Sequence, residues 1–180
     1  MDSLWDNIFR SRDETGPAAL LRQVPMFADL DRREIAEVRK ILYRREYRAG
    51  EVIFRQDDPG VGMYVIEEGT VDIVHEPTNR VLADLGVGDV FGEIALLNET
   101  PRSARAVATT ATTLYGLFQP ELYDLVKRAP RLGVKLLLPL ARTLGARLVH
   151  ADEQLERLHA QAAAAEESVQ SNGARDVTVG

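Results

Sequence analysis

The stretch MYVIEEGTVDIVHEPTNRVLADL, from Met63 to Leu85, decides the fold class. It holds three short runs rich in β-branched residues, at 63–66, 71–74 and 81–85, and turn-forming residues such as Glu68-Gly69 separate them. Runs of this length and composition, bounded by turn residues, are typical of β-strands. The stretch therefore predicts three successive strands.

The strand pattern continues on both sides of this stretch. Further β-rich runs lie at 52–54, 106–108 and 114–118, with turn signals such as Asp57-Asp58-Pro59-Gly60 and Gly86-Val87-Gly88 between runs. Many short strands at intervals of about ten residues indicate a β-sandwich or barrel. The central part of the chain is therefore expected to be mainly β.

Helical patterns flank the predicted strands. On the N-terminal side, Asp31 with Glu34 resembles a capping box, and Ile35, Val38 and Leu42 then recur at helical spacing. On the C-terminal side the strand pattern stops at about residue 119, and a long helix is expected from about residue 130. The element order is thus helices, strands, then a long helix.

The long helix carries a heptad repeat. Its apolar positions alternate at spacings of four and three, and they are Leu137, Ala141, Leu144, Leu148, Ala151, Leu155, Leu158, Ala162, Ala165 and Val169. A repeat of this kind predicts a parallel homodimer through a coiled coil. Pro139 is expected to kink the helix or to mark its start, and Gly145 weakens it.

Composition excludes several classes of protein. The chain has 180 residues, no cysteine and a net charge of -6, so a disulfide framework is excluded and a nucleic-acid-binding surface is not expected. No window is apolar enough for a membrane span, which predicts a soluble cytoplasmic protein. His75, His150 and His159 are the only histidines, and they are too scattered for a metal site on adjacent strands. Neither a metal, a cofactor nor an enzymatic activity is expected.

One segment combines a glycine, an acid and an arginine at a fixed interval. Gly92 precedes Glu93, and Arg102 follows nine residues after Glu93, with one helical turn expected at 93–97. An arginine can bind a phosphate through two donors, and a helix N-terminus offers further N–H groups. A carboxylate beside a phosphate is explained if it faces a neutral donor such as a sugar hydroxyl. The alternative from spacing alone is a structural Glu93–Arg102 ion pair.

The segment FGEIALLNETPRSA, residues 91–104, resembles the phosphate-binding cassette of cyclic nucleotide-binding domains. The resemblance extends from about residue 24 to about residue 148, and it includes PMFADL, YRAGEVIFRQDDPGVGMYVIEEGTVDI and LADLGVGDVFGE. These domains occur in catabolite-activator-type regulators, protein kinase A regulatory subunits and gated channels. The resemblance implies an eight-stranded jelly-roll β-barrel, with N-terminal helices and a long C-terminal helix, that binds cyclic AMP or cyclic GMP.

The family's roles map onto matching residues of the segment. By resemblance, Glu93 would accept the ribose 2′-hydroxyl, Arg102 would pair with the cyclic phosphate, and a small Ala104 would permit close approach. Backbone N–H groups would contact the same phosphate, at Ile94 or Ala95 and at Ser103. The family's turn glycines, where a positive φ is expected, are Gly50, Gly60, Gly69 and Gly92. The candidates for the apolar wall of the pocket, which also fit an ordinary core, are Val52, Met63, Val65, Phe91 and Leu96.

The residues that would read the base remain ambiguous. A hydroxyl such as that of Ser103 fits either cyclic AMP or cyclic GMP binders, and alignment places Thr143 and Arg147 near the base. Arg147 also occupies a heptad g position, where its partner would be Asp152 of the other chain. Both roles of Arg147 stay open.

The expected organisation has four parts: an N-terminal arm and linker at 1–17, the nucleotide-binding β-barrel with flanking helices at 18–129, the lid and dimerisation helix at 130–169, and a disordered tail at 170–180. Residues 166–180 are too few and not basic enough for a helix-turn-helix domain, so the chain is expected to be a free-standing sensor. It would relay nucleotide binding through its C-terminal helix to an unknown protein partner, without contacting DNA or membrane. The arm around Trp5 docks either on its own domain or on a partner. The alternative is an interaction module with a vestigial pocket.

Overall fold

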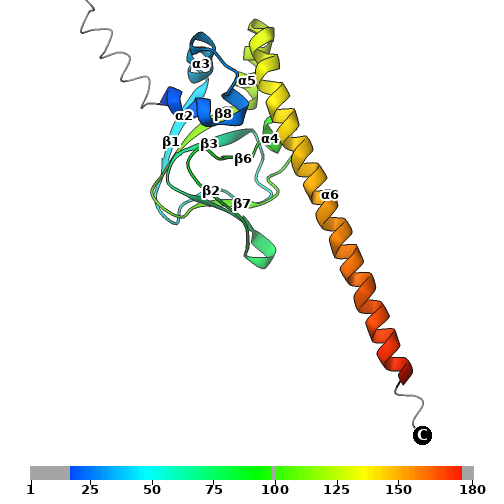
Figure 1. Cartoon of the computed structure of the whole chain (residues 1–180). Helices are drawn as coiled ribbons and strands as arrows, with labels where there is room; N and C mark the ends of the chain where they lie inside the picture. Colours follow the sequence, from blue (N-terminus) through cyan, green and yellow to red (C-terminus); the bar gives the residue numbers. More distant parts are fainter. Residues whose placement is uncertain (1–16, 99, 176–180) are drawn as a thin grey trace, which may run out of the picture. The chain divides into compact units, whose positions relative to one another are not determined.

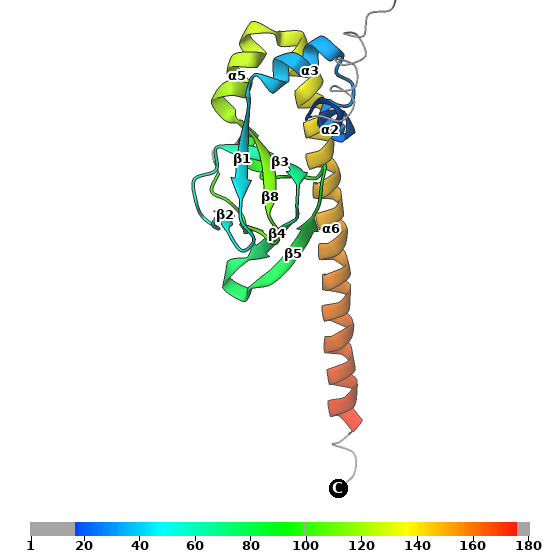
Figure 2. The ribbon, with the colours of Figure 1, turned by 90° about the vertical axis from the view of Figure 1, so that its left-hand side faces the viewer.

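The computed structural model describes residues 17–98 and 100–175, and it divides the chain into two compact units, Met1–Leu140 and Ala141–Gly180. The last helix begins at Pro130, as expected, and the boundary between the two units falls inside it. The first unit contains the strands and the shorter helices, and Figures 1 and 2 show it from two sides.

Three helical segments precede the first strand: α2 (Pro17–Gln23), the 3-10 turn η1 (Pro25–Phe27) and α3 (Arg32–Arg39). The predicted capping box is confirmed, because the Asp31 carboxylate accepts from the backbone of Glu34 at 2.9 Å and the Glu34 carboxylate accepts from the backbone of Asp31 at 2.8 Å. The helical extension to Leu42 is wrong, because α3 ends at Arg39 and Leu42 begins a strand.

The described residues form eight strands in two four-stranded antiparallel sheets. One sheet has the order β1-β8-β3-β6, and the other has the order β2-β7-β4-β5. The strands are β1 (Leu42–Tyr47), β2 (Val52–Phe54), β3 (Gly62–Glu68), β4 (Val71–His75), β5 (Arg80–Leu85), β6 (Val90–Phe91), β7 (Arg105–Ala108) and β8 (Thr112–Phe118), with the 3-10 turn η2 (Glu76–Thr78) between β4 and β5. A closed barrel is not found, since pairing among the described residues stays within each sheet.

Two strands did not stand out in the sequence. β1 reads LYRREY, with charged residues where a buried strand would be apolar, and it lies at the edge of its sheet, where charges are tolerated. β6 has only two residues, too few for a periodic pattern. Both strands take their place from pairing, β1 with β8 and β6 with β3.

The main hydrophobic core lies between the two sheets. Tyr64, Ile66, Phe91 and Leu114 come from one sheet, while Val71 and Ala106 come from the other, and all six are buried together. Because side chains alternate along a strand, Met63 and Val65 of β3 point to the opposite face of their sheet. The sheet therefore buries both of its faces along β3.

Three helices follow the strand region or interrupt it: α4 (Ile94–Leu97), α5 (Gln119–Arg128) and α6 (Pro130–Arg175). Pro139 lies inside α6 and does not mark its start. Residues 170–175 are helical, so the expected tail begins too early, and residues 176–180 lie outside the described part. Among the described residues, no helix has the length and apolar character needed to cross a membrane.

In the first unit, α6 buries one face. Leu132, Leu136 and Leu140 are at most 5% exposed, and their spacing of four residues places them on one side of the helix. The heptad position Leu137 is only half-buried there. The helix face that packs into the core of the first unit, with Leu132, Leu136 and Leu140, is therefore not the face that carries the heptad positions.

Candidate functional site

Arg102 is one of two acidic or basic residues that are buried in the first unit among the described residues, and it is only 5% exposed. It lies in the segment between α4 and β7. Its Nη1 donates to the backbone carbonyls of Gly62 at 2.7 Å and Gly92 at 3.1 Å. Its guanidinium stacks over the Phe54 ring at 4.1 Å from the centroid. Cations at this distance are attracted by the ring.

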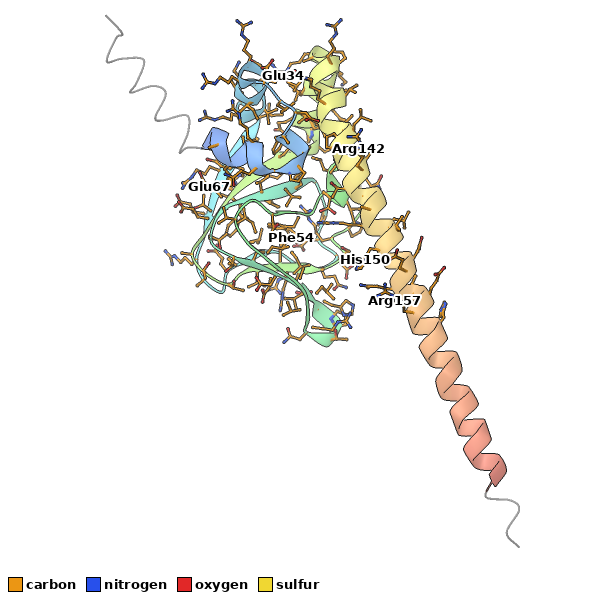
Figure 3. The ribbon with its side chains drawn as sticks, in the orientation of Figure 1. Glu34, Phe54, Glu67, Arg142, His150 and Arg157 are labelled. Carbon is orange, nitrogen blue, oxygen red and sulfur yellow. The ribbon has the colours of Figure 1, made fainter. Side chains whose placement is uncertain are left out.

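The aromatic residues around Arg102 form a stack between the two sheets. Phe54 packs on Tyr64 and Phe91, with ring centroids 6.1 and 5.9 Å away, and Tyr64 packs on Phe91 at 5.4 Å. Figure 3 labels Phe54 within the strand region. Sequence reasoning missed Phe54 and Tyr64 as site residues. The sequence shows that residues 54 and 64 are aromatic, but only the pairing of their strands in the two sheets brings the rings next to the Arg102 guanidinium.

A turn at residues 55–58 holds the backbone of Arg102. The N–H of Asp57 donates to the carbonyl of Arg102, and the N–H of Arg102 donates to the carbonyl of Asp58, both at 2.9 Å. The Asp58 carboxylate closes the turn by accepting from the N–H of Arg55 at 2.7 Å. This turn overlaps the predicted turn Asp57-Asp58-Pro59-Gly60, but the sequence gave no sign that it would contact Arg102.

The surroundings of Arg102 leave one of its buried donor atoms without a partner among the described residues. Within the described residues, its Nε–H is buried and has no hydrogen-bond acceptor. Burial lowers the pKa of Arg102, and nearby acidic groups, among them Asp58 and Glu93, oppose that shift. Arginine remains charged under these conditions, since its ordinary pKa is above about 12. A buried, charged group with an unused donor is suited to binding an anion.

Gly92 permits this packing for two reasons. Its φ is +73°, a conformation that L side chains rarely adopt, and a Cβ at this position would lie 2.5 Å from Nη1 of Arg102. The positive φ expected at Gly50, Gly69 and Gly92 is confirmed, but the expectation is wrong for Gly60. Gly60 is required sterically, because a Cβ there would lie 2.4 Å from Cβ of Ala95.

The cassette residues gather around the short helix α4. Glu93 is the N-cap of α4 and only 2% exposed, although it is an acidic residue. Ala95 and Ala104 are buried, whereas Ile94 is 46% exposed and the Ser103 side chain is exposed. The predicted helical turn after Glu93 is thus confirmed.

The predicted apolar wall is brought together only in part. Phe91 belongs to the aromatic stack formed with Phe54 and Tyr64. Val65 is fully buried, but strand alternation places it on the face opposite Tyr64, away from the side on which Arg102 stacks. Val65 is therefore a core residue of the other face of the sheet.

Apart from Leu137, the predicted residues of the C-terminal helix lie in the second unit. Thr143 and Leu144 are partly buried, while Ala141, Arg147, Leu148, Ala151 and Leu155 are exposed in the single chain. Leu158 and the later heptad positions lie outside the residues whose side chains are described, as does the arm around Trp5. Among the described residues, no group of three or more His, Cys, Asp or Glu side chains could hold a metal ion.

Comparison with known proteins identifies the family. Residues 44–129 match the family model of the cyclic nucleotide-binding domain. The cyclic AMP receptor protein of Thermus thermophilus is 37% identical over 137 residues, which cover 74% of this chain and 62% of that protein. The cAMP-dependent protein kinase regulatory subunit of Schizosaccharomyces pombe is 33% identical over 135 residues, which cover 71% of this chain and 32% of that protein.

A solved structure shows the same relationship over nearly its whole length. The N-terminal domain of a transcriptional regulator from Streptomyces coelicolor superposes with a TM-score of 0.64 and 32% identity, covering 71% of this chain and 94% of that domain. The chain spans less than two thirds of each of the two curated relatives. On the cassette, the sheets and these matches together, the chain belongs to the cyclic nucleotide-binding domain family.

Proposed function

We propose that the chain is a non-catalytic sensor that binds a 3′,5′-cyclic nucleotide. The observation that carries this proposal is the buried guanidinium of Arg102, whose Nε–H has no acceptor among the described residues. A buried charge is costly unless it is paired and hydrogen-bonded. A cyclic phosphate would supply both the opposite charge and the missing acceptor.

Arg102 is held ready for a phosphate. Two carbonyls hold Nη1 from one side and the Phe54 ring supports the guanidinium plane, so little side-chain freedom would be lost on binding. The N–H groups of Ile94 or Ala95 and of Ser103 would contribute further donors, as the family resemblance implies. Ala104 is buried, and its small side chain would permit the ligand to approach these donors closely, as the family resemblance implies.

Glu93 would recognise the sugar. An ionised carboxylate only accepts hydrogen bonds, and it would repel a phosphate placed directly beside it. The ribose 2′-hydroxyl of a cyclic nucleotide is a neutral donor at a short distance from the phosphate. The burial of Glu93 next to Arg102 therefore supports a ligand that carries an anion and a hydroxyl together.

Cyclic AMP is the favoured ligand over cyclic GMP, because two relatives are a cyclic AMP receptor and a subunit of a cAMP-dependent kinase. The Thermus thermophilus protein is a cyclic AMP receptor and the Schizosaccharomyces pombe protein belongs to a cAMP-dependent kinase. We keep Thr143 as a candidate base contact. For Arg147 we keep both candidate roles, contact with the base and an ion pair with Asp152 of a second chain.

The output of the sensor would pass through α6. Leu148 and Leu155 are 64% and 53% exposed in the single chain, which supports a partner helix that covers the heptad face. We infer that nucleotide binding orders the helix after Pro139, strengthens a homodimer and exposes or hides a surface for a protein partner.

Titration calorimetry tests the nucleotide site. The purified chain, freed of bound ligand by denaturation and refolding, should bind cyclic AMP or cyclic GMP. Arg102→Ala should weaken that binding by about 3–5 kcal/mol, since the phosphate would be left buried without its charge partner. This loss corresponds to roughly two to four orders of magnitude in the dissociation constant.

Two control variants separate binding from folding. Arg102→Lys keeps the charge but loses the planar set of donors, so it should bind more weakly than the unchanged protein while remaining folded. Arg22→Ala removes an exposed arginine of α2 and should leave binding unchanged. Wild-type affinity in a folded Arg102→Ala variant would refute the site. No binding of any cyclic nucleotide by the folded protein would favour a vestigial pocket.

A further inference from the structure

A surface groove of about 560 Å³ lies between α3 and the junction of α5 with α6. Three residues of α3, Arg33, Glu34 and Glu37, form one wall, and residues 129–132 form the other. Figure 2 shows α3 and α5 beside the first turns of α6. The volume falls within the roughly 300–1,000 Å³ of protein pockets that enclose drug-sized ligands, so an aromatic side chain would fit.

Ion pairs fix the two walls relative to each other. Both carboxylate oxygens of Glu34 accept from Nζ of Lys135 at 2.8 Å, and Figure 3 labels Glu34 on α3. Glu37 pairs with Arg128 of α5 at 3.5 Å. The acidic side chains of the groove are thus already partnered within the unit. The groove is therefore present before anything binds, and the charged lining residues without an ion-pair partner among the described residues are arginines.

Arg33 and Arg131 supply that positive charge. Among the described residues, neither guanidinium forms an ion pair, and both residues are exposed at the edge of the groove. Between them lies an apolar floor from Ala129, Pro130 and Leu132. A segment that fits this surface would combine large apolar side chains with neighbouring acidic ones.

We propose that residues 1–16 of the same chain dock in this groove. Their apolar residues are Met1, Leu4, Trp5, Ile8 and Phe9, and two of their four acidic residues, Asp2 and Asp6, stand beside them. The aspartates are complementary to Arg33 and Arg131, and the apolar side chains to the floor between these arginines. The combination matches the groove in both chemistry and sign of charge.

The position of the segment in the chain supports docking within one molecule. Residue 16 is followed directly by α2, and α2 packs against α3, which forms one wall of the groove. The twelve residues from Trp5 to the start of α2 can span up to about 40 Å when extended, so Trp5 has ample length to reach a neighbouring helix. Docking within the chain also costs less entropy than binding a separate molecule.

Fluorescence of the full-length chain tests the proposal, because Trp5 is its only tryptophan. A docked indole should emit at shorter wavelength than in the denatured chain and should be protected from acrylamide quenching. The double variant Arg33→Glu with Arg131→Glu should shift the emission toward that of the denatured chain and raise quenching several-fold. Both new acids lie in the first turn of a helix, where negative charge is favourable, so the fold should persist.

A second variant and a control complete the test. Ala129→Phe fills the groove without changing charge, and it should release Trp5 to the same extent. Arg32→Glu reverses an exposed charge of α3 outside the groove and should leave the emission unchanged. Circular dichroism checks that each variant is folded.

Three outcomes would overturn the proposal. Trp5 emission equal to that of the denatured chain would mean that the segment does not dock. If Trp5 is shielded but its emission and quenching are unchanged in both groove variants, the segment docks at another surface. A shielded Trp5 that becomes exposed on dilution would mean that a second copy of the chain supplies the segment.

Discussion

Two residues, Arg102 and Gly92, define the candidate site at the smallest scale. Arg102 is buried with a charged side chain, and the backbone carbonyl of Gly92 accepts from it. The absence of a side chain at Gly92 provides the space in which Nη1 lies. The positive φ of Gly92 and the packing of Arg102 are therefore parts of one feature.

Gly92→Ala should damage both stability and nucleotide binding. The positive φ costs an L residue roughly 1–2 kcal/mol, and the new Cβ would displace the arginine side chain. Urea denaturation measures the first effect and calorimetry the second. We expect a loss of stability of about that size together with a clear loss of affinity for the cyclic nucleotide.

Gly50→Ala is the matched control for this change. Gly50 has a similar φ of +81°, but a Cβ added to it would meet no atom within 4 Å. This variant should therefore lose similar stability and keep its affinity. Equal affinity losses in both variants would contradict the assigned role of Gly92.

At the scale of elements, the turn at 55–58 connects the end of β2 to the backbone of Arg102. Its two backbone hydrogen bonds align Arg102, and the Asp58 carboxylate closes the turn. Asp57 adopts a φ of 66°, which is uncommon for a residue with a side chain but tolerated by aspartate. The turn is thus part of the candidate site through its backbone contacts with Arg102.

Asp58→Ala should lower stability and weaken nucleotide binding indirectly. It removes the acceptor for the N–H of Arg55, a contribution of about 0.5–1.5 kcal/mol. Asp58→Asn keeps an oxygen acceptor and should behave like the unchanged protein in thermal unfolding. A stable Asp58→Ala variant with unchanged affinity would mean that Arg102 is positioned without this turn.

At the scale of the whole molecule, α6 carries two apolar faces with different uses. Leu132, Leu136 and Leu140 are buried in the first unit, whereas Leu148 and Leu155 are exposed in the second. The exposed pair falls on the heptad repeat. A helix that exposes a regular apolar seam is expected to acquire a partner, and a second copy provides the matching seam.

Leu148→Glu combined with Leu155→Glu should convert a homodimer into monomers, as measured by sedimentation velocity. Charges at these positions would face each other across the seam. Val149→Glu is the control, because Val149 is also apolar and 59% exposed but lies off the heptad. Dimers that persist in the double variant would place the interface on another surface.

The dimer and the nucleotide site should also be linked. If binding strengthens the dimer, dimerisation raises nucleotide affinity by the same factor. The monomeric double variant should accordingly bind the cyclic nucleotide more weakly than the Val149→Glu control. Equal affinities would separate the two properties.

The sequence by itself determined the features that depend on neighbours along the chain. β-Branched runs between turn residues identified β3, β4, β5 and β8, and Asp31 with Glu34 identified the capping box. The cassette at 91–104 identified the family and the pair Glu93 and Arg102, because its spacing is local and specific. Each of these signals lies within a short segment, where backbone geometry links residue type to structure directly.

Only the tertiary structure decided what depends on residues far apart in the sequence. It placed Phe54 beneath Arg102 and supplied the carbonyl of Gly62 to its side chain, forty residues away. It also shows that Val65 lies on the face of the sheet opposite Tyr64 and that β1 is an edge strand. It further shows that Glu34 accepts a hydrogen bond from Lys135. These arrangements follow from strand pairing and from the burial of apolar faces. Neither has a fixed spacing in the sequence, because chain segments of any separation can form the same contact.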